Sequence, residues 1–275
     1  MSLSQQELIA RLHQLPSLPV VVQEVIASFK DPGLDTPSLV EKISLDQGLS
    51  AKLLRVSNSS FYGLPRRIGS VQDAVVVLGF DVVRSLVLSA GISKIFPTVP
   101  GSPFDRQAYW RKSFRVAVFS KALATMLRNE PQLAFTAGMF HDIGLLVLDL
   151  CAPQQFAELL QVHVTTGEDL IGIARRELGF DHTSIGAEII RYWNFPAEIE
   201  RVARDCHQLA IVPIDPLAGI VHLAILLERG LVGEDLMESL PQVLKDGLEI
   251  SWVRIEECLP SRVQLEVATA WLSDP

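Results

Sequence analysis

A histidine and an aspartate stand side by side in the stretch Gly138-Met139-Phe140-His141-Asp142-Ile143-Gly144. A neutral imidazole and a carboxylate are both good ligands for a divalent metal. Neighbouring residues on a helix point about 100° apart, so this pair would flank one ion from the end of a helix. The simpler interpretation is a histidine hydrogen-bonded inside the core, because such pairs also occur by chance.

Helical signals surround this stretch on both sides. Ser4-x-x-Glu7 forms a capping box, Asp46 is placed to cap a helix, and Ser70 restarts one after a loop over residues 58–69. Residues 75–78 are β-branched enough for a strand, but Gln72-Asp73-Ala74 precedes them and no partner strand is nearby. We therefore predict an all-α fold. Its clearest helices are expected over residues 20–29, 81–95, 104–127, 133–141, 153–165, 169–178, 182–192, 196–207, 216–228 and 261–272.

A segment with three prolines and one glycine, residues 96–103, interrupts the helical pattern. It predicts a hinge between an N-terminal helical lobe, residues 1–98, and a second helical lobe with a C-terminal helical extension, residues 99–275. The net charge of −8 lies almost entirely in the second lobe. An acidic surface repels phosphate backbones, so nucleic acid is not an expected partner.

The chain shows no membrane or export signal. Its N-terminus lacks the positive start and cleavage site of a signal peptide. The most apolar window, residues 209–227, contains Asp215, His222 and two prolines, which favours a buried core helix over a membrane span. Three widely spaced cysteines are typical of reduced thiols, so we expect a cytoplasmic protein without disulfides.

Motifs spread over most of the chain resemble the HD superfamily and, more closely, its HDOD branch. The N-terminal ones are LPSLP at 15–19, ISLDQGLS at 43–50, LLRVSNSSFYG at 53–63, RIGSVQDA at 67–74 and LGF at 78–80. The later ones are WRKS at 110–113, the His-Asp stretch, ELGFDH at 177–182 and WNFP at 193–196. The resemblance implies the HDOD fold, an N-terminal helical lobe packed on an HD-like helical bundle, and a role in bacterial signal transduction.

The resemblance also implies where metal ligands would stand. Active HD enzymes carry an early histidine, the His-Asp pair, later histidines and a late aspartate, which hold metals that activate water. Four positions keep a residue that can ligate a metal: His141, Asp142, His182 and His207. His207 is the second residue of an expected histidine pair that here is Cys206-His207. The early histidine aligns with Lys112, whose charged ammonium cannot ligate a metal. The late aspartate aligns with Ile225, which has only an alkyl chain.

The expected site is therefore vestigial. It consists of Lys112, His141, Asp142, His182 and His207, with no catalytic residue and no bound metal, because losing ligands weakens metal affinity severely. We expect the Lys112 ammonium to pair with Asp142 where a metal would sit. The histidines and Asp142 would then form a buried polar network that joins four helices.

Three functions are compatible with these residues. The favoured one is a non-catalytic regulatory module that contacts signalling proteins of unknown identity and needs no cofactor. The alternative is a metal-dependent phosphohydrolase that uses a divalent transition metal on a nucleotide or cyclic dinucleotide. A third is binding of a small anionic ligand through Lys112 without turnover.

Overall fold

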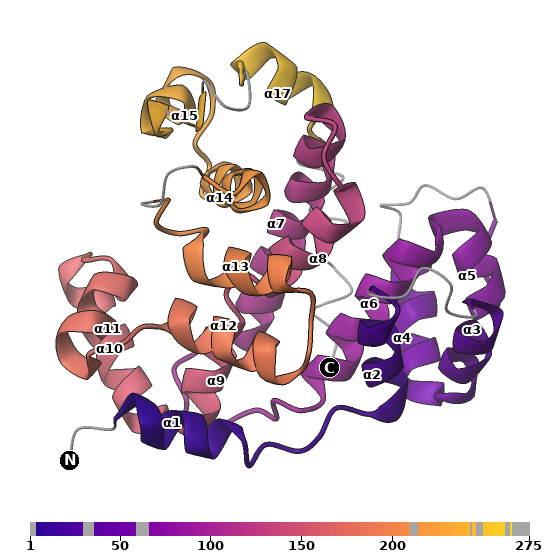
Figure 1. The fold of residues 1–275 in the computed structure, drawn as a ribbon, viewed down its shortest axis with the longest axis horizontal. Helices are drawn as coiled ribbons and strands as arrows, with labels where there is room; N and C mark the ends of the chain where they lie inside the picture. The colour runs from indigo at the N-terminus through magenta and orange to yellow at the C-terminus, as the bar shows by residue number, and fades with distance from the viewer. Residues whose placement is uncertain are drawn as a thin grey trace.

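A computed structural model describes residues 4–29, 36–58, 66–209, 214–242, 244–245, 250–261 and 265 of the chain. Every regular element within these ranges is an α-helix (Figure 1), which confirms the all-α prediction. In chain order the helices are α1 (Gln5–Leu12), α2 (Val20–Ala27), α3 (Thr36–Leu45), α4 (Gln47–Ser57), α5 (Val71–Leu78), α6 (Phe80–Ser93), α7 (Arg106–Met126), α8 (Pro131–Phe140), α9 (Ile143–Cys151), α10 (Pro153–Thr166), α11 (Leu170–Leu178), α12 (His182–Tyr192), α13 (Ala197–Asp205), α14 (Pro216–Glu228), α15 (Gly233–Ser239) and α17 (Trp252–Cys258).

Local capping explains where several of these helices begin. The Ser4 hydroxyl accepts a hydrogen bond from the Glu7 amide at 3.2 Å, and the Glu7 carboxylate accepts one from the Ser4 amide at 2.8 Å. Asp46 and Ser70 cap α4 and α5 in the predicted way, each accepting from the amide three residues later. Each such cap satisfies a backbone donor that would otherwise have no partner, and contributes about 1 kcal/mol.

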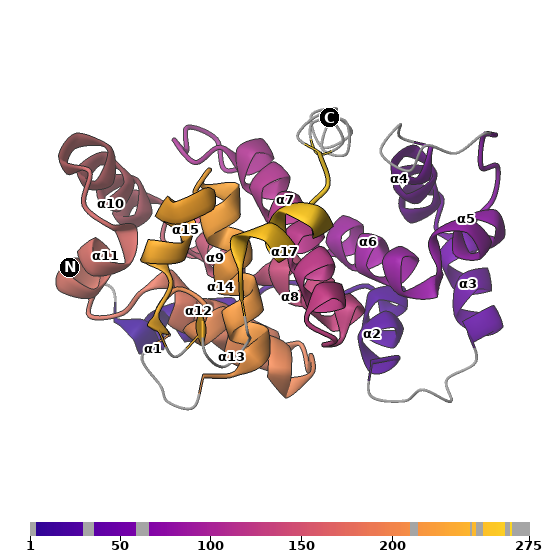
Figure 2. The same ribbon diagram turned by 90° about the horizontal axis from the view of Figure 1, so that it is seen from above.

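Helices α2 to α6 pack against one another at one end of the molecule (Figures 1 and 2). The remaining helices form a bundle in which α7 runs along both α8 and α14. The two groups meet where α6 packs on α8. Helix α1 packs on α9 and α12, so it lies with the bundle although it precedes the other N-terminal helices (Figure 1). The division of the chain at residue 98 stays a prediction.

The segment predicted as a hinge is held to the bundle by a buried carboxylate. Asp149 on α9 is fully buried, and it accepts hydrogen bonds from Ser102 and from Arg106. Arg106 also donates to the Phe96 carbonyl oxygen at 2.5 Å. The two ends of the proline-rich segment are thereby joined through one guanidinium.

The stretch Pro131–Cys151, which contains α8 and α9, is the one part of the described chain that is long and apolar enough to cross a membrane. In the structure 89% of its apolar window is buried inside the protein, as in the core helix of a soluble protein.

Three helices differ from the sequence prediction. Helix α9 is not predicted, because apart from Asp149 its residues are apolar or glycine and show no helical alternation. The short helices α15 and α17 are not predicted either. The helix expected over 261–272 lies almost wholly outside the described residues, and so do residues 59–65 of the expected loop.

Candidate functional site

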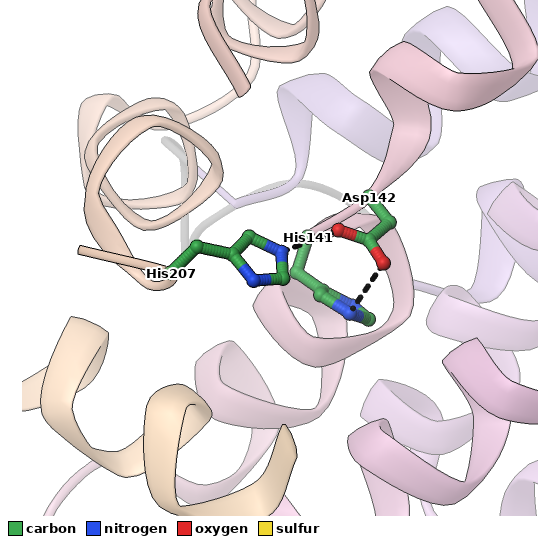
Figure 3. Close-up of side chains that lie close together, drawn as sticks. All are labelled: His141, Asp142 and His207. Carbon is green, nitrogen blue, oxygen red and sulfur yellow. Dashed lines mark hydrogen bonds and ion pairs between the residues drawn. The ribbon is translucent and has the colours of Figure 1, made fainter. Parts of the chain in front are cut away.

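Four parts of the bundle bring together the five residues of the expected site. Lys112 lies in the middle of α7, His141 and Asp142 separate α8 from α9, His182 begins α12, and His207 follows α13. Figure 3 shows the side chains of His141, Asp142 and His207 turned toward one another. The four residues that flank Asp142 each place a nitrogen within 3.4 Å of its carboxylate.

Two glycines allow these helices to come close enough. A Cβ atom on Gly144 would lie 1.9 Å from the carbonyl oxygen of His182, so α9 and α12 touch backbone to backbone at this point. A Cβ atom on Gly138 would lie 2.8 Å from the Cα atom of Ala117 on α7. The absence of side chains at these positions therefore sets the distance from the α8–α9 junction to α12 and to α7.

Asp142 is the centre of the polar network. Its Oδ2 atom lies 2.9 Å from Lys112 Nζ, and its Oδ1 atom lies 2.5 Å from His207 Nε2. His182 Nε2 lies 3.4 Å from Oδ1, and His141 Nε2 lies 3.2 Å from Oδ2. The carboxylate is 2% exposed, so its charge depends on these neighbours for stabilisation.

The protonation states follow from burial and from this pairing. Burial pushes the pKa of Asp142 up, but the combined opposing effect of His141, Lys112 and His207 holds it well below its usual range. The charge of Asp142 raises the pKa of the Lys112 ammonium. Burial lowers the pKa of His207 to about 4 even though Asp142 acts in the other direction. At neutral pH the site thus holds one carboxylate, one ammonium and a neutral His207 whose Nε2–H donates to Asp142.

The same atoms permit a test of whether a metal would fit. One ligand atom each from His141, Asp142 and His207 lies within 4.8 Å of the others. His141 Nδ1 donates to the Gly138 carbonyl at 2.7 Å, and its buried Nε2 has no hydrogen-bond partner among the described residues. This nitrogen lies 3.2 Å from Asp142 Oδ2, so a metal bound by it would also contact the carboxylate. Both carboxylate oxygens, however, already face donors, so a metal would require Lys112 to move away and His207 to change tautomer.

The remaining positions carried over from the resemblance add no ligand to this cluster. Ile225 is buried in α14 and offers only an alkyl chain. Cys206 is buried as well, and burial raises the pKa of its thiol well above the usual value. Its backbone carbonyl accepts a hydrogen bond from His222 Nδ1 at 2.7 Å. These contacts make Cys206 and His222 part of the packing between α13 and α14.

The sequence predicts an anion-binding pocket at Lys112, and the structure has a cavity beside this residue whose walls the sequence does not predict. It has a volume of about 550 Å³ and is lined in part by Tyr109, Lys112, Arg115 and Glu228. Tyr109, Lys112 and Arg115 are spaced three residues apart on α7, which places them on one face of the helix. That spacing is visible in the sequence, but Tyr109 also fits an ordinary core position there, and nothing in the sequence places Glu228 opposite Arg115.

The fold and this histidine–aspartate centre define an all-helical protein of the HD type. The chain belongs to the HDOD domain family, whose model matches residues 15–209. An uncharacterised protein of Treponema pallidum (strain Nichols) is 25% identical over 252 residues, which are 90% of this chain and 47% of that protein. The chain therefore spans about half the length of this relative.

Three crystal structures resemble the fold over almost the whole chain. A protein of Shewanella amazonensis SB2B, provisionally named a phosphohydrolase, is 26% identical with a TM-score of 0.79, and the match covers 97% of this chain and 98% of that one. An HDOD domain protein of unknown function from Geobacter sulfurreducens is 23% identical with a TM-score of 0.81, covering 96% and 97%. A protein of Marinobacter aquaeolei VT8, provisionally named a signal transduction protein, is 26% identical with a TM-score of 0.78, covering 95% and 60%.

Proposed function

We propose that this chain is a non-catalytic regulatory module of bacterial signal transduction, which acts through contacts with other signalling proteins. The observation that carries the proposal is the ion pair between Lys112 and Asp142, 2.9 Å long and set on a carboxylate that is 2% exposed. The ammonium supplies the positive charge that a metal would otherwise bring. The module needs no metal or other cofactor.

The ligands that a hydrolytic metal centre needs differ from the residues found at this site, and this difference supports the proposal. Such a centre needs about three protein ligands and an open position for water. Here His207 and Lys112 face the two oxygens of Asp142, and the position of the late aspartate is Ile225. The donor set does not fit a hydrolytic metal, so no hydrolytic step is assigned to any residue of this site.

The similarity to the Marinobacter aquaeolei protein supports a role in signalling. That protein is provisionally named a signal transduction protein, and this chain covers 60% of its length. A domain that occurs inside longer chains is suited to passing a signal to a neighbouring domain or protein. For this chain we propose a cytoplasmic location and protein partners, with neither nucleic acid nor a membrane among them.

The second candidate is a metal-dependent phosphohydrolase acting on a nucleotide or cyclic dinucleotide. Two observations on the site favour it. Three ligand atoms lie within 4.8 Å of one another, and the buried His141 Nε2 has no hydrogen-bond partner among the described residues. The Shewanella amazonensis protein, provisionally named a phosphohydrolase, is similar over 97% of this chain.

Hydrolysis of phosphodiesters separates the two candidates. The full chain and its Asp142→Asn variant would be incubated with Mn²⁺, Fe²⁺ or Ni²⁺ and with bis-p-nitrophenyl phosphate or a cyclic dinucleotide. We expect equal rates, because a site without a metal has nothing for Asp142 to position. A wild-type rate more than about tenfold above the variant would establish the phosphohydrolase, since tenfold corresponds to about 1.4 kcal/mol of transition-state stabilisation.

A further inference from the structure

The cavity beside Lys112 has the dimensions and walls of a small-molecule site. Its volume of about 550 Å³ falls in the range of roughly 300–1,000 Å³ typical of ligand pockets. Side chains from α7, α9, α10 and α11 form apolar walls, and Phe104 before α7 adds an aromatic one. The apolar lining residues on the helices include Ala108, Leu145, Ala157, Leu160 and Leu170. A ligand with an apolar body would be held here by burial of its carbon surface.

The polar lining of the cavity holds two cations, Lys112 and Arg115, the mostly buried carboxylate of Glu228, and at 64% exposure the carboxylate of Asp105. Lys112 and Arg115 can only donate, and both line the cavity. The Tyr109 side chain also lines it, is 4% exposed, and has a hydroxyl without a hydrogen-bond partner among the described residues. Burial and the charge of Asp142 raise the pKa of this hydroxyl, so it keeps its proton at neutral pH.

A buried donor without a partner costs free energy that a suitable ligand would recover. Glu228 is the mostly buried acceptor in this polar lining, and its Oε1 atom accepts hydrogen bonds from Arg115. The group that completes this arrangement must bring its own acceptor oxygens. A negative charge on it would be stabilised by Lys112 and Arg115 together.

We propose that this cavity binds a small organic acid, with its apolar body among the walls and its carboxylate or phosphate on Lys112, beside Tyr109. The Lys112 ammonium is the link to the buried network, because it also pairs with Asp142. A second anion competes with Asp142 for the same ammonium. Occupation of the cavity therefore loosens the contact between α7 and the α8–α9 junction.

Under the proposed function, the ligand would be the signal that the regulatory module senses. This signalling role rests on the proposed function, whereas the binding of the ligand does not. Binding is measured directly and needs no hydrolysis, so it is read out separately from the proposed function. The same protein preparations can be tested for both, so a failure of one leaves the other measurable.

Calorimetric titration of the full chain with three probes tests the proposal. The probes are octanoate, monooctyl phosphate and octanol, which share one apolar body and differ in the head group. Lys112→Met removes the donor, and Ala157→Phe fills the cavity from half-exposed Ala157 on α10. The matched controls are Lys121→Met, which removes a charge elsewhere on α7, and Ala51→Phe, which adds the same ring at an exposed position of α4.

We expect saturable binding of at least one acid at one molecule per chain, with octanol weaker by about tenfold or more because it forms no charge-assisted hydrogen bond. Lys112→Met and Ala157→Phe should each lower the affinity for that acid by about tenfold or more, and the control variants should leave this affinity unchanged. Binding of only one acid identifies the head group as a carboxylate or a phosphate. The proposal is overturned if neither acid binds, if octanol binds equally well, or if folded Ala157→Phe protein binds like the wild type.

Discussion

Asp142 carries a buried negative charge, and the group that neutralises it determines what the site can do. A metal in contact with Asp142 would activate a bound water, whereas a lysine supplies a positive charge without activating water. Lys112 is attached to α7, so it neutralises Asp142 without any ion from solution. Under this proposal the site is a buried polar network that links helices, and a ligand that contacts Lys112 can still weaken the links.

The strength of this network can be measured by removing one partner. Lys112→Met should lower the free energy of unfolding by about 2 kcal/mol, because it leaves a buried carboxylate without its cation. The full cost of breaking a buried pair does not apply, since the Lys112 side chain is 30% exposed. Urea unfolding followed by circular dichroism measures the change. Adding Asp142→Asn should restore part of the loss, while Lys121→Met on the same helix should change little. Equal effects of Lys112→Met and Lys121→Met would contradict the buried pairing.

His207 predicts a pH dependence of stability. Its pKa is lowered from 6.5 to about 4 in the folded protein, so between these values the unfolded chain binds a proton that the folded protein does not. Stability should fall as the pH falls from 6.5 to about 4, and this one group accounts for at most about 3 kcal/mol.

The variant His207→Gln should remove this component, so that its unfolding free energy depends less on pH over that window. His13→Gln, which changes an exposed ring, is the control and should keep the wild-type profile. A wild-type pH profile in His207→Gln would show that His207 is protonated to the same extent in the folded and unfolded chain.

At the scale of elements, the contact between α9 and α12 fixes the site. Gly144→Ala should lower the free energy of unfolding by about 3 kcal/mol or more, because the new Cβ atom would lie 1.9 Å from the His182 carbonyl oxygen and one backbone must move. Gly172→Ala on α11 is the matched control, since nothing lies within 4 Å of its added Cβ atom. It should stabilise the protein slightly, by up to about 1 kcal/mol. Thermal unfolding that ranks the two variants equally would refute the close contact.

The elements that the sequence predicts well are those with a local cause. Ser4, Asp46 and Ser70 cap helices at the expected residues, and the long helix expected over 104–127 is α7 (Arg106–Met126). Helix α9 escapes prediction because a helix buried on every side has no polar face to mark its period. The position of α1 on α9 and α12 escapes it too, since it depends on contacts between residues far apart in the chain.

At the scale of the whole molecule, the sequence indicates which residues form the site but not their surroundings. The expected ion pair between Lys112 and Asp142 is present, and the three histidines of the expected site lie around the same carboxylate. A pocket at Lys112 is expected from the sequence, but its walls could not be predicted, because they come from α7, α9, α10, α11 and α14 and depend on how these helices pack. The tautomer of His141 likewise depends on the Gly138 carbonyl, which only the fold places beside the ring.

The module acts as a unit because buried polar groups join its parts. Asp149 and Arg106 hold the proline-rich segment to α9. Asp142, directly before the same helix, joins α7, α12 and the end of α13 through Lys112 and two histidines, His182 and His207. Under the proposed function, a change at the ammonium on α7 would affect each of the helices that these contacts join.

The proposal that Lys112 takes the place of a metal at Asp142 is tested most directly by the metal content of the protein. The full chain would be purified without a chelator or a metal-binding tag and analysed by plasma mass spectrometry. We expect less than about a tenth of an equivalent of any transition metal, because the available ligands are too few and already hydrogen-bonded. About one equivalent or more of iron, manganese, zinc or nickel, lost in a His141→Ala variant, would contradict this role of Lys112 and establish a functional metal site.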